Sequence, residues 1–212
     1  MVNSLFKYKS ISGDSFKYTQ DIFLNKRIYL PEVLQMNDPT EGLFTLELED
    51  KNNHLTKYAN ERYIDATKRL GIFSLSESNN NILMWAHYAD NHTGICIEFD
   101  VSQQGSVFSG IQKINYSDKL PHIKRNQNET EILMQGLLNK TSDWSYEAEW
   151  RLINCANKYY QLRNEIITVI VGSRISSDNL NWVKYWIKDN PHISLKKCIF
   201  SKTEYKVNIV DL

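Results

Sequence analysis

Hydrophobic and polar positions along the chain follow two periods, and segments of the two kinds alternate. A period of two residues predicts strands over 4–9, 26–30, 72–76, 94–99, 111–116, 149–155, 195–200 and 205–210. Another strand is expected over 165–172, and because this segment is nearly all apolar we expect it near the centre of a sheet.

A period near 3.6 residues predicts helices over 19–25, 54–70, 82–90, 132–138 and 180–187. Asn81 and Ser177 are expected to cap the helices that follow them, and Asn128 with Glu131 has the spacing of a capping box. Gly71 is expected to end the helix before it, as glycine past a helix often does.

Strands outnumber helices, and several connections are too short for parallel crossovers. The pattern therefore predicts an α+β fold with a mixed, mainly antiparallel sheet and flanking helices. The 212 residues contain no repeat and no Pro/Gly-rich linker, so we expect a single domain over 1–212.

Charge and cysteine content narrow the class of protein. Lys and Arg total 25, as do Asp and Glu, which argues against coating nucleic acid by charge alone but leaves a local basic groove open. Cys96, Cys155 and Cys198 are scattered, which favours reduced thiols in a cytosol. No segment resembles a signal peptide or a membrane span, so we expect a cytoplasmic protein without membrane partners.

The segment Asn37-Asp38-Pro39-Thr40-Glu41 is the first of three blocks that stand out. Short polar side chains that bond their own backbone, followed by proline, are typical of a structural turn. The alternative is a loop that orders a substrate or a catalytic strand.

The second block combines hydroxyls and aromatic rings. Ser74 and Ser76 are two residues apart, so on a strand they face the same side and either bond a neighbouring strand or line a polar cleft. Trp85 and Tyr88 are three apart on a helix and more often belong to a core than to a stacking platform. His87 lacks a histidine at metal-ligand spacing, and no metal site is expected.

The third block, residues 144–151, carries the most specific signal. If Glu147 and Glu149 are both extended, their carboxylates point to one face and raise the pKa of one of the pair unless a cation relieves them. Arg151 continues that face and is the expected cation. Such a pair suits a site that accepts a proton and stabilises a positive centre. The alternative is a solvated stripe on an edge strand.

Other catalytic signals are weak. No G-x-S-x-G elbow is present, and Cys96 between two isoleucines is expected to be a buried small hydrophobe. Gly94 and Gly172 stand alone and do not form a phosphate loop.

The order of these blocks resembles a bacterial family, domain-of-unknown-function family 2971. The resemblance is carried by Phe6-Lys7-Tyr8-Lys9-Ser10, Asn37-Asp38-Pro39, the segment 82–94 and the segment 144–151. It spans residues 6 to about 172 and implies no activity.

A looser resemblance is to mono-ADP-ribosyltransferases, which order an Arg, a Ser-x-Ser and a Glu-x-Glu along the chain. Here Lys9 takes the place of the Arg, followed by Ser74 and Ser76, then Glu147 and Glu149. The resemblance implies that Lys9 and the serines hold NAD as substrate, that Glu149 stabilises the ribosyl cation and that Glu147 prepares the acceptor. Lysine offers a cation but not the bidentate fork of arginine.

The other residues expected to contact NAD are Tyr8, Trp85, His87, Tyr146 and Arg151. The resemblance implies an ADP-ribosyltransferase-like fold and transfer to an unknown protein or nucleic-acid acceptor, in a bacterial toxin or anti-phage effector with a possible antitoxin or immunity partner. Two alternatives stay open: a nuclease or NAD hydrolase using the same carboxylates, and a non-catalytic module that binds a nucleotide or a partner.

Overall fold

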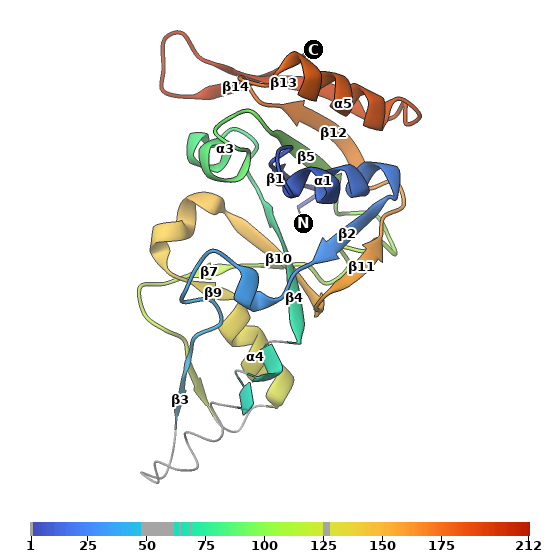
Figure 1. Cartoon of the computed structure of the whole chain (residues 1–212). Helices are drawn as coiled ribbons and strands as arrows, with labels where there is room; N and C mark the ends of the chain where they lie inside the picture. Colours follow the sequence, from blue (N-terminus) through green and yellow to red (C-terminus); the bar gives the residue numbers. More distant parts are fainter. Residues whose placement is uncertain (1, 48–61, 64, 68, 125–127) are drawn as a thin grey trace.

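The computed structural model describes residues 2–47, 62–63, 65–67, 69–124 and 128–212. Its largest element is an eight-stranded sheet with the strand order β14-β13-β12-β5-β1-β4-β10-β6 (Figure 1). These strands are β1 (Ser4–Lys9), β4 (Leu70–Ser76), β5 (Ile95–Asp100), β6 (Gln112–Lys113), β10 (Glu149–Cys155), β12 (Ile166–Val171), β13 (Ser194–Phe200) and β14 (Val207–Asp211).

Three two-stranded pairs and the helices complete the fold. The pairs are β2 (Arg27–Leu30) with β11 (Lys158–Gln161), β3 (Thr45–Glu47) with β8 (His122–Lys124), and β7 (Asn115–Tyr116) with β9 (Asn139–Lys140). The helices whose bounds lie within the described residues are α1 (Ser15–Leu24), α3 (Ile82–Tyr88), α4 (Glu129–Leu137) and α5 (Ser177–Ile187), with short 3₁₀ helices η1 (Val33–Gln35) and η2 (Ser142–Glu147).

Most neighbouring strands of the large sheet run antiparallel, and β12 with β13 is its parallel pair. The expected mixed, mainly antiparallel sheet with flanking helices is thus confirmed. β12 lies between β5 and β13, and Val169, Ile170 and Val171 on it are almost fully buried, as the apolar run predicted.

Helices cover both faces of the sheet (Figure 1). On one face, Ile22 and Phe23 of α1 and Trp186 of α5 pack into the main core with Ile97 and Val169 from the strands. Burying such side chains is the main favourable term in folding.

A second core cluster lies against α3. Trp85 is fully buried there, in an edge-to-face contact with Tyr8 at 5.2 Å between ring centroids, and Cys96 and Cys198 pack into the same cluster. Cys96 is thus the buried hydrophobe that the sequence predicted. Cys96, Cys155 and Cys198 are all free thiols.

The large sheet divides at the boundary between β1 and β4. β1 pairs with β5 from Ser4 to Lys9, but it pairs with β4 at a single position, Phe6 opposite Ser76. Both strands lie wholly within the described residues. Past that position the two strands separate, which opens a fork in the sheet between Lys7–Lys9 and Ile72–Ser74.

Two glycines in this region are explained by close backbone approach. A Cβ on Gly94 would lie 2.3 Å from the carbonyl oxygen of Lys9, and one on Gly172 would lie 2.1 Å from that of His92. Neither glycine belongs to a phosphate loop; each lets two chain segments pass.

Most elements begin and end near the predicted positions, and four predictions need correction. The helix at 19–25 begins earlier, at Ser15. Gly71 lies inside β4 rather than ending a helix, and the helix predicted at 54–70 lies largely outside the described residues. Ser176, not Ser177, caps α5, and the strand at 111–116 is two short strands, β6 and β7. Asn81 and the Asn128–Glu131 capping box are confirmed.

Within the described part of the chain, no helix combines the length and the apolar character that crossing a bilayer requires.

Candidate functional site

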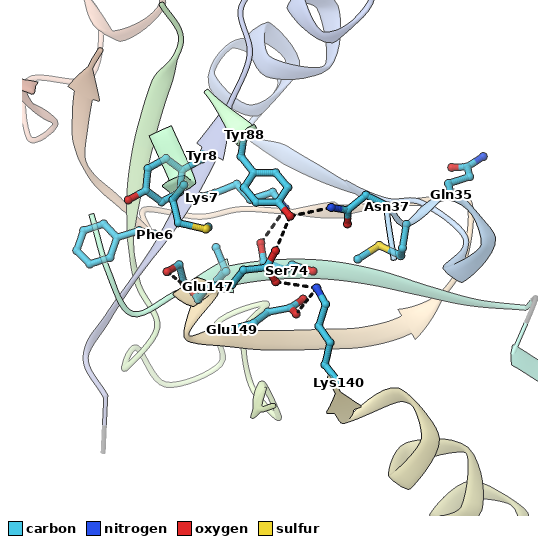
Figure 2. A pocket seen from close by; sticks show the side chains of 14 residues that line it. Phe6, Lys7, Tyr8, Gln35, Asn37, Ser74, Tyr88, Lys140, Glu147 and Glu149 are labelled. Atoms are coloured by element: carbon cyan, nitrogen blue, oxygen red, sulfur yellow. Dashed lines mark hydrogen bonds and ion pairs between the residues drawn. The ribbon is translucent and has the colours of Figure 1, made fainter. Parts of the chain in front are cut away.

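A cavity of about 260 Å³ lies at the fork between β1 and β4 (Figure 2). It takes side chains from β1, β4, α3, β9, η2 and β10, and from the segment after η1. Its polar lining residues are Lys7, Tyr8, Gln35, Asn37, Ser74, Ser76, Tyr88, Lys140, Glu147 and Glu149. Segments far apart in the sequence therefore meet here, including parts of all three blocks.

Glu147 and Glu149 both line this cavity, although not by the predicted route. Glu147 ends the 3₁₀ helix η2, and the left-handed conformation of Ala148 (φ 44°) turns the chain into β10, which begins at Glu149. The two carboxylates converge through this turn and not through the alternation of one strand.

The two carboxylates share one buried cation, Lys140. Its ammonium lies 2.7 Å from Oε2 of Glu147 and 3.5 Å from Oε2 of Glu149. The Lys140 side chain is 2% exposed, so this ion pair is shielded from water. Lys140 also lies 4.7 Å from the ring centroid of Trp144.

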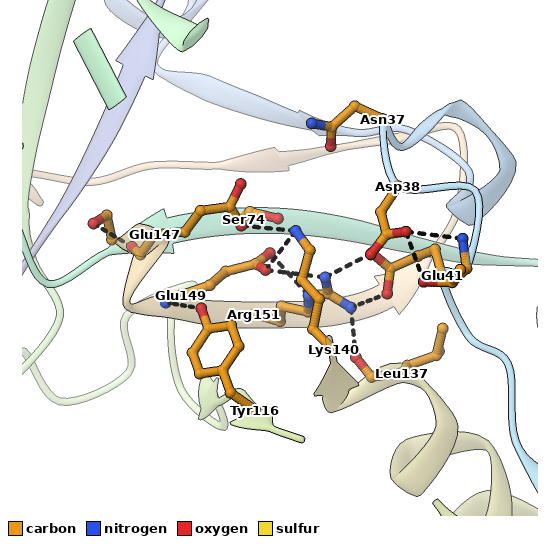
Figure 3. Close-up of polar contacts among 12 residues, drawn as sticks. Asn37, Asp38, Glu41, Ser74, Tyr116, Leu137, Lys140, Glu147, Glu149 and Arg151 are labelled. Carbon is orange, nitrogen blue, oxygen red and sulfur yellow. Dashed lines mark hydrogen bonds and ion pairs between the residues drawn. The ribbon is translucent and has the colours of Figure 1, made fainter. Parts of the chain in front are cut away.

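Arg151 is the second cation of the cluster, as the sequence predicted. Its Nε donates to Oε1 of Glu149 at 2.8 Å and its Nη2 to Oε2 at 3.0 Å, a bidentate pair. The guanidinium also donates to both carboxylate oxygens of Glu41 and to the carbonyl of Leu137 (Figure 3). Arg151 is fully buried.

These contacts decide the alternative for the third block. Glu147, Glu149 and Arg151 are 4%, 3% and 0% exposed, and β10 is flanked by β4 and β6. A solvated stripe on an edge strand is therefore wrong.

The pKa values of two carboxyl groups follow from this arrangement. Burial works to raise the pKa of Glu149, but Arg151 and Lys140 outweigh it and hold that pKa below its usual value. Burial raises the pKa of Glu41 despite its pairing with Arg151. Of these two groups, Glu149 is the one whose ionised form its surroundings favour.

Tyr88 of α3 reaches the same carboxylates from the other side of the cavity. Its hydroxyl donates to Oε1 of Glu147 and accepts from Nδ2 of Asn37 at 2.8 Å (Figure 2). Burial and the neighbouring Glu147 raise the pKa of Tyr88, so it stays protonated and donates. Trp85 and Tyr88 do not share an environment: one lies in the core, the other in the cavity.

The first block forms the structural turn that the sequence predicted. Oδ1 of Asp38 accepts from the backbone N–H of Thr40 at 2.8 Å and from its hydroxyl at 2.7 Å, which makes the turn. Glu41 binds Arg151 and Asn37 binds Tyr88, so the turn is tied to β10 and to α3.

The two serines of β4 face the carboxylates across the strand pair. Ser76 lies opposite Glu149 and Ser74 opposite Arg151 in the β4–β10 ladder. Ser76 Oγ donates to the carbonyl of Glu147 at 2.6 Å. Ser74 Oγ is buried and forms no hydrogen bond of good geometry with a described residue, yet it lies near enough to help lower the pKa of Glu149.

A second cavity of about 310 Å³ adjoins the first, and both have Lys7, Gln35, Met36 and Ser74 in their walls. It lies toward α1 and β2, where Tyr18 and Tyr29 stack at 5.8 Å between ring centroids. Lys9 lines this second cavity and not the first. It is thus Lys7 that stands beside the carboxylates.

Of the residues expected to contact NAD, four line neither cavity: Trp85, His87, Tyr146 and the fully buried Arg151. Trp85 is also fully buried, whereas His87 is exposed. His87 and Tyr146 contact each other at 6.3 Å between ring centroids. Tyr8 lines the first cavity, but its hydroxyl already donates to the carbonyl of Ser78 at 2.8 Å.

Sequence reasoning missed Lys140, Lys7 and the role of Tyr88. Lys140 lies in the two-residue strand β9, with no motif to mark it. Lys7 lies in the motif 6–10, and its position on the same strand face as Lys9 was the available signal. Among the described residues, no group of three or more His, Cys, Asp or Glu is arranged to hold a metal ion.

Comparisons with known proteins agree with the first resemblance. No curated protein and no solved structure matches the chain. Residues 84–152 match the model of a family described as "Protein of unknown function (DUF2971)". The predicted resemblance to this family is therefore confirmed over the segment that carries Tyr88, Lys140, Glu147 and Glu149.

Proposed function

We propose that this protein is an NAD-dependent mono-ADP-ribosyltransferase, with the fold type that such an activity implies. The observation that carries the proposal is the meeting of Glu147 and Glu149 with Ser74 and Ser76 at one cavity, with Ser76 directly opposite Glu149 on the adjacent strands β4 and β10. Serines and a carboxylate pair in this relation are what NAD binding and ribosyl transfer require.

The reaction breaks the bond between nicotinamide and ribose C1′ and leaves positive charge on the ribose ring. A fixed, ionised carboxylate stabilises such a charge, and the lowered pKa of Glu149 suits it to that role. The bond electrons leave with nicotinamide, which becomes neutral. Glu147 would accept the proton that the acceptor loses as its bond to C1′ forms.

The two cavities offer room and charge for a dinucleotide. Their combined space falls in the range of about 300–1,000 Å³ that is usual for small-molecule sites. Lys7 and Lys9 in the second cavity supply cations toward a pyrophosphate, and the Tyr18–Tyr29 stack supplies an aromatic wall. Ser74, unpartnered and shared by both cavities, supplies a donor between them.

The test is transfer of label from adenylate-labelled NAD to a bacterial lysate, with parallel samples treated with protease or nuclease. Label that depends on the protein and disappears in Glu149→Gln supports the proposal and identifies the acceptor class. Glu147→Gln is the second variant, in case loss of Glu149 impairs folding. Glu77→Gln is the matched control, because Glu77 follows β4 directly but does not line the cavity.

Other outcomes would replace the proposal. Free nicotinamide without labelled acceptor indicates an NAD hydrolase on the same carboxylates. Nucleic-acid cleavage that stops in chelator indicates a metal-dependent nuclease. Binding of NAD with neither product indicates a non-catalytic nucleotide-binding module.

A further inference from the structure

Lys7 occupies the fork where β1 and β4 separate. Its ammonium donates to the carbonyl oxygen of Ser74 at 2.7 Å, on a part of β4 that β1 no longer pairs with. It also lies 4.7 Å from the ring centroid of Phe73. The side chain thus fills a gap in the sheet, and its end lines both cavities.

No described residue forms an ion pair with Lys7. None of the described residues that line the second cavity is acidic, and another cation, Lys9, lies two residues along the same strand face. Burial, reinforced by the charge of Lys9, lowers the pKa of Lys7 to about 7 against the partial opposition of Glu149 and Glu147.

We propose that the Lys7 amine is a nucleophile for carbonyl compounds, and that an aldehyde entering the cavities forms an imine with it. A lysine shielded from water beside a second cation is a recognised form of activated amine. The proposal does not depend on the ADP-ribosyltransferase assignment. It concerns a C=N bond formed by Lys7 Nζ, whereas the transfer concerns the bond between nicotinamide and ribose C1′.

The reaction balances without a further reactant. The Nζ lone pair attacks the carbonyl carbon, the carbonyl oxygen takes a proton, and the resulting carbinolamine loses water to give the C=N bond. Glu147 and Glu149 line the same cavity and can relay protons during the loss of water. Lys9, in the adjoining cavity, favours aldehydes that carry an anionic group.

The groups around Lys7 set the pH range of the reaction. The charged side chains that line the cavities with it are Lys9 on β1, Lys140 on β9, Glu147 at the end of η2 and Glu149 at the start of β10. The tyrosines that line them come from β1, α1, β2 and α3. Among these, Lys9 is the one that opposes the charged form of Lys7 most strongly.

The test uses the full-length protein with pyridoxal 5′-phosphate, an aldehyde that carries a phosphate, and cyanoborohydride, which reduces the imine to a stable secondary amine. Peptide mass spectrometry then gives the labelling rate of each lysine at pH 7. Lys26 and Lys202, both exposed, are internal references. We expect Lys7 to react at least about tenfold faster than either, because ordinary lysines are almost fully protonated at this pH.

Two variants separate activation from mere access. Lys9→Gln removes the neighbouring charge, so the midpoint of the pH–rate profile of Lys7 should move upward and labelling at pH 7 should slow; Lys9→Arg should leave both unchanged. Labelling of Lys7 no faster than of Lys26 and Lys202 would overturn the proposal. So would a pH–rate midpoint near that of the exposed lysines.

Discussion

The ammonium of Lys140 lies 2.7 Å from Oε2 of Glu147, with the two side chains 2% and 5% exposed. This buried pair links β9 to the end of η2 and places a cation between two carboxylates that would otherwise repel. Arg151 and Glu149 on β10 form a second buried ion pair beside it. The candidate site is thus a chain of alternating charges, from Glu41 through Arg151, Glu149 and Lys140 to Glu147.

Replacing Lys140 by methionine should destabilise the protein by about 3–5 kcal/mol at pH 7, because it leaves Glu147 and Glu149 buried without their shared cation. Urea unfolding measures this loss. The control is Lys113→Met, which breaks an exposed pair with Glu77 and should cost less than about 1 kcal/mol. Equal losses in the two variants would contradict the importance of the buried cation.

Glu41→Gln should also destabilise the protein, by about 2–4 kcal/mol, since it leaves part of the Arg151 guanidinium without its carboxylate partner. Glu32→Gln serves as a control, because Glu32 also precedes the site on the chain but does not contact Arg151.

A double-mutant cycle between Glu41→Gln and Asn37→Ala tests whether the turn is held as a unit. If the losses of unfolding free energy in the two single variants simply add in the double variant, the contacts of Glu41 and Asn37 hold the turn independently.

Glu149 makes the free energy of unfolding depend on pH in the acid range. Because its folded-state pKa lies below the ordinary 4.5, its contribution is fully present above that pH and is lost as the pH falls through the folded-state pKa. The free energy of unfolding, measured between pH 7 and pH 3, should therefore fall with acid in the wild type. In Glu149→Gln the fall should be shallower, and an unchanged slope would argue against a depressed pKa.

Lys7 affects the free energy of unfolding at neutral to alkaline pH, and in the opposite sense, because the folded protein disfavours its charged form. Its pKa is about 7 in the folded protein against an ordinary 10.5, so between these values the unfolded chain binds more protons and stability rises with pH. Lys7→Met should be more stable than the wild type at pH 6, with the advantage shrinking as the pH rises toward 10. Lys26→Met, at an exposed position, should show no such trend.

Tyr88→Phe keeps the ring and removes the hydroxyl that bonds Glu147 and Asn37. If the proposed transfer takes place, kcat/KM should fall by about 10- to 100-fold, which corresponds to about 1.4–2.7 kcal/mol. His87→Phe is the control, because His87 neighbours Tyr88 but does not line the cavity. The ratio of the two rates, with labelled NAD at fixed concentration, decides whether the hydroxyl positions Glu147.

Much of the fold was predictable because the pattern was local. β1, β10 and the caps at Asn81 and Asn128 follow from alternation and short polar side chains, which act within a few residues. The prediction for Gly71 was wrong because a glycine that follows a helical pattern commonly ends the helix. Here glycine is needed for close packing instead, since a Cβ at this position would lie 2.8 Å from the carbonyl oxygen of Leu30.

By itself, the sequence determined most of the strands and helices and the mainly antiparallel sheet. It nominated Ser74, Ser76, Glu147, Glu149 and Arg151 for one site, together with Tyr8 and Lys9 and with Trp85, His87 and Tyr146, which line neither cavity. Only the tertiary structure decided that Lys140 and Glu41 complete the charge network and that Lys7 stands at the fork. These partners lie up to 110 residues from the groups they contact. Local spacing cannot encode such contacts, because the strand pairing that brings them together depends on the packing of the whole chain.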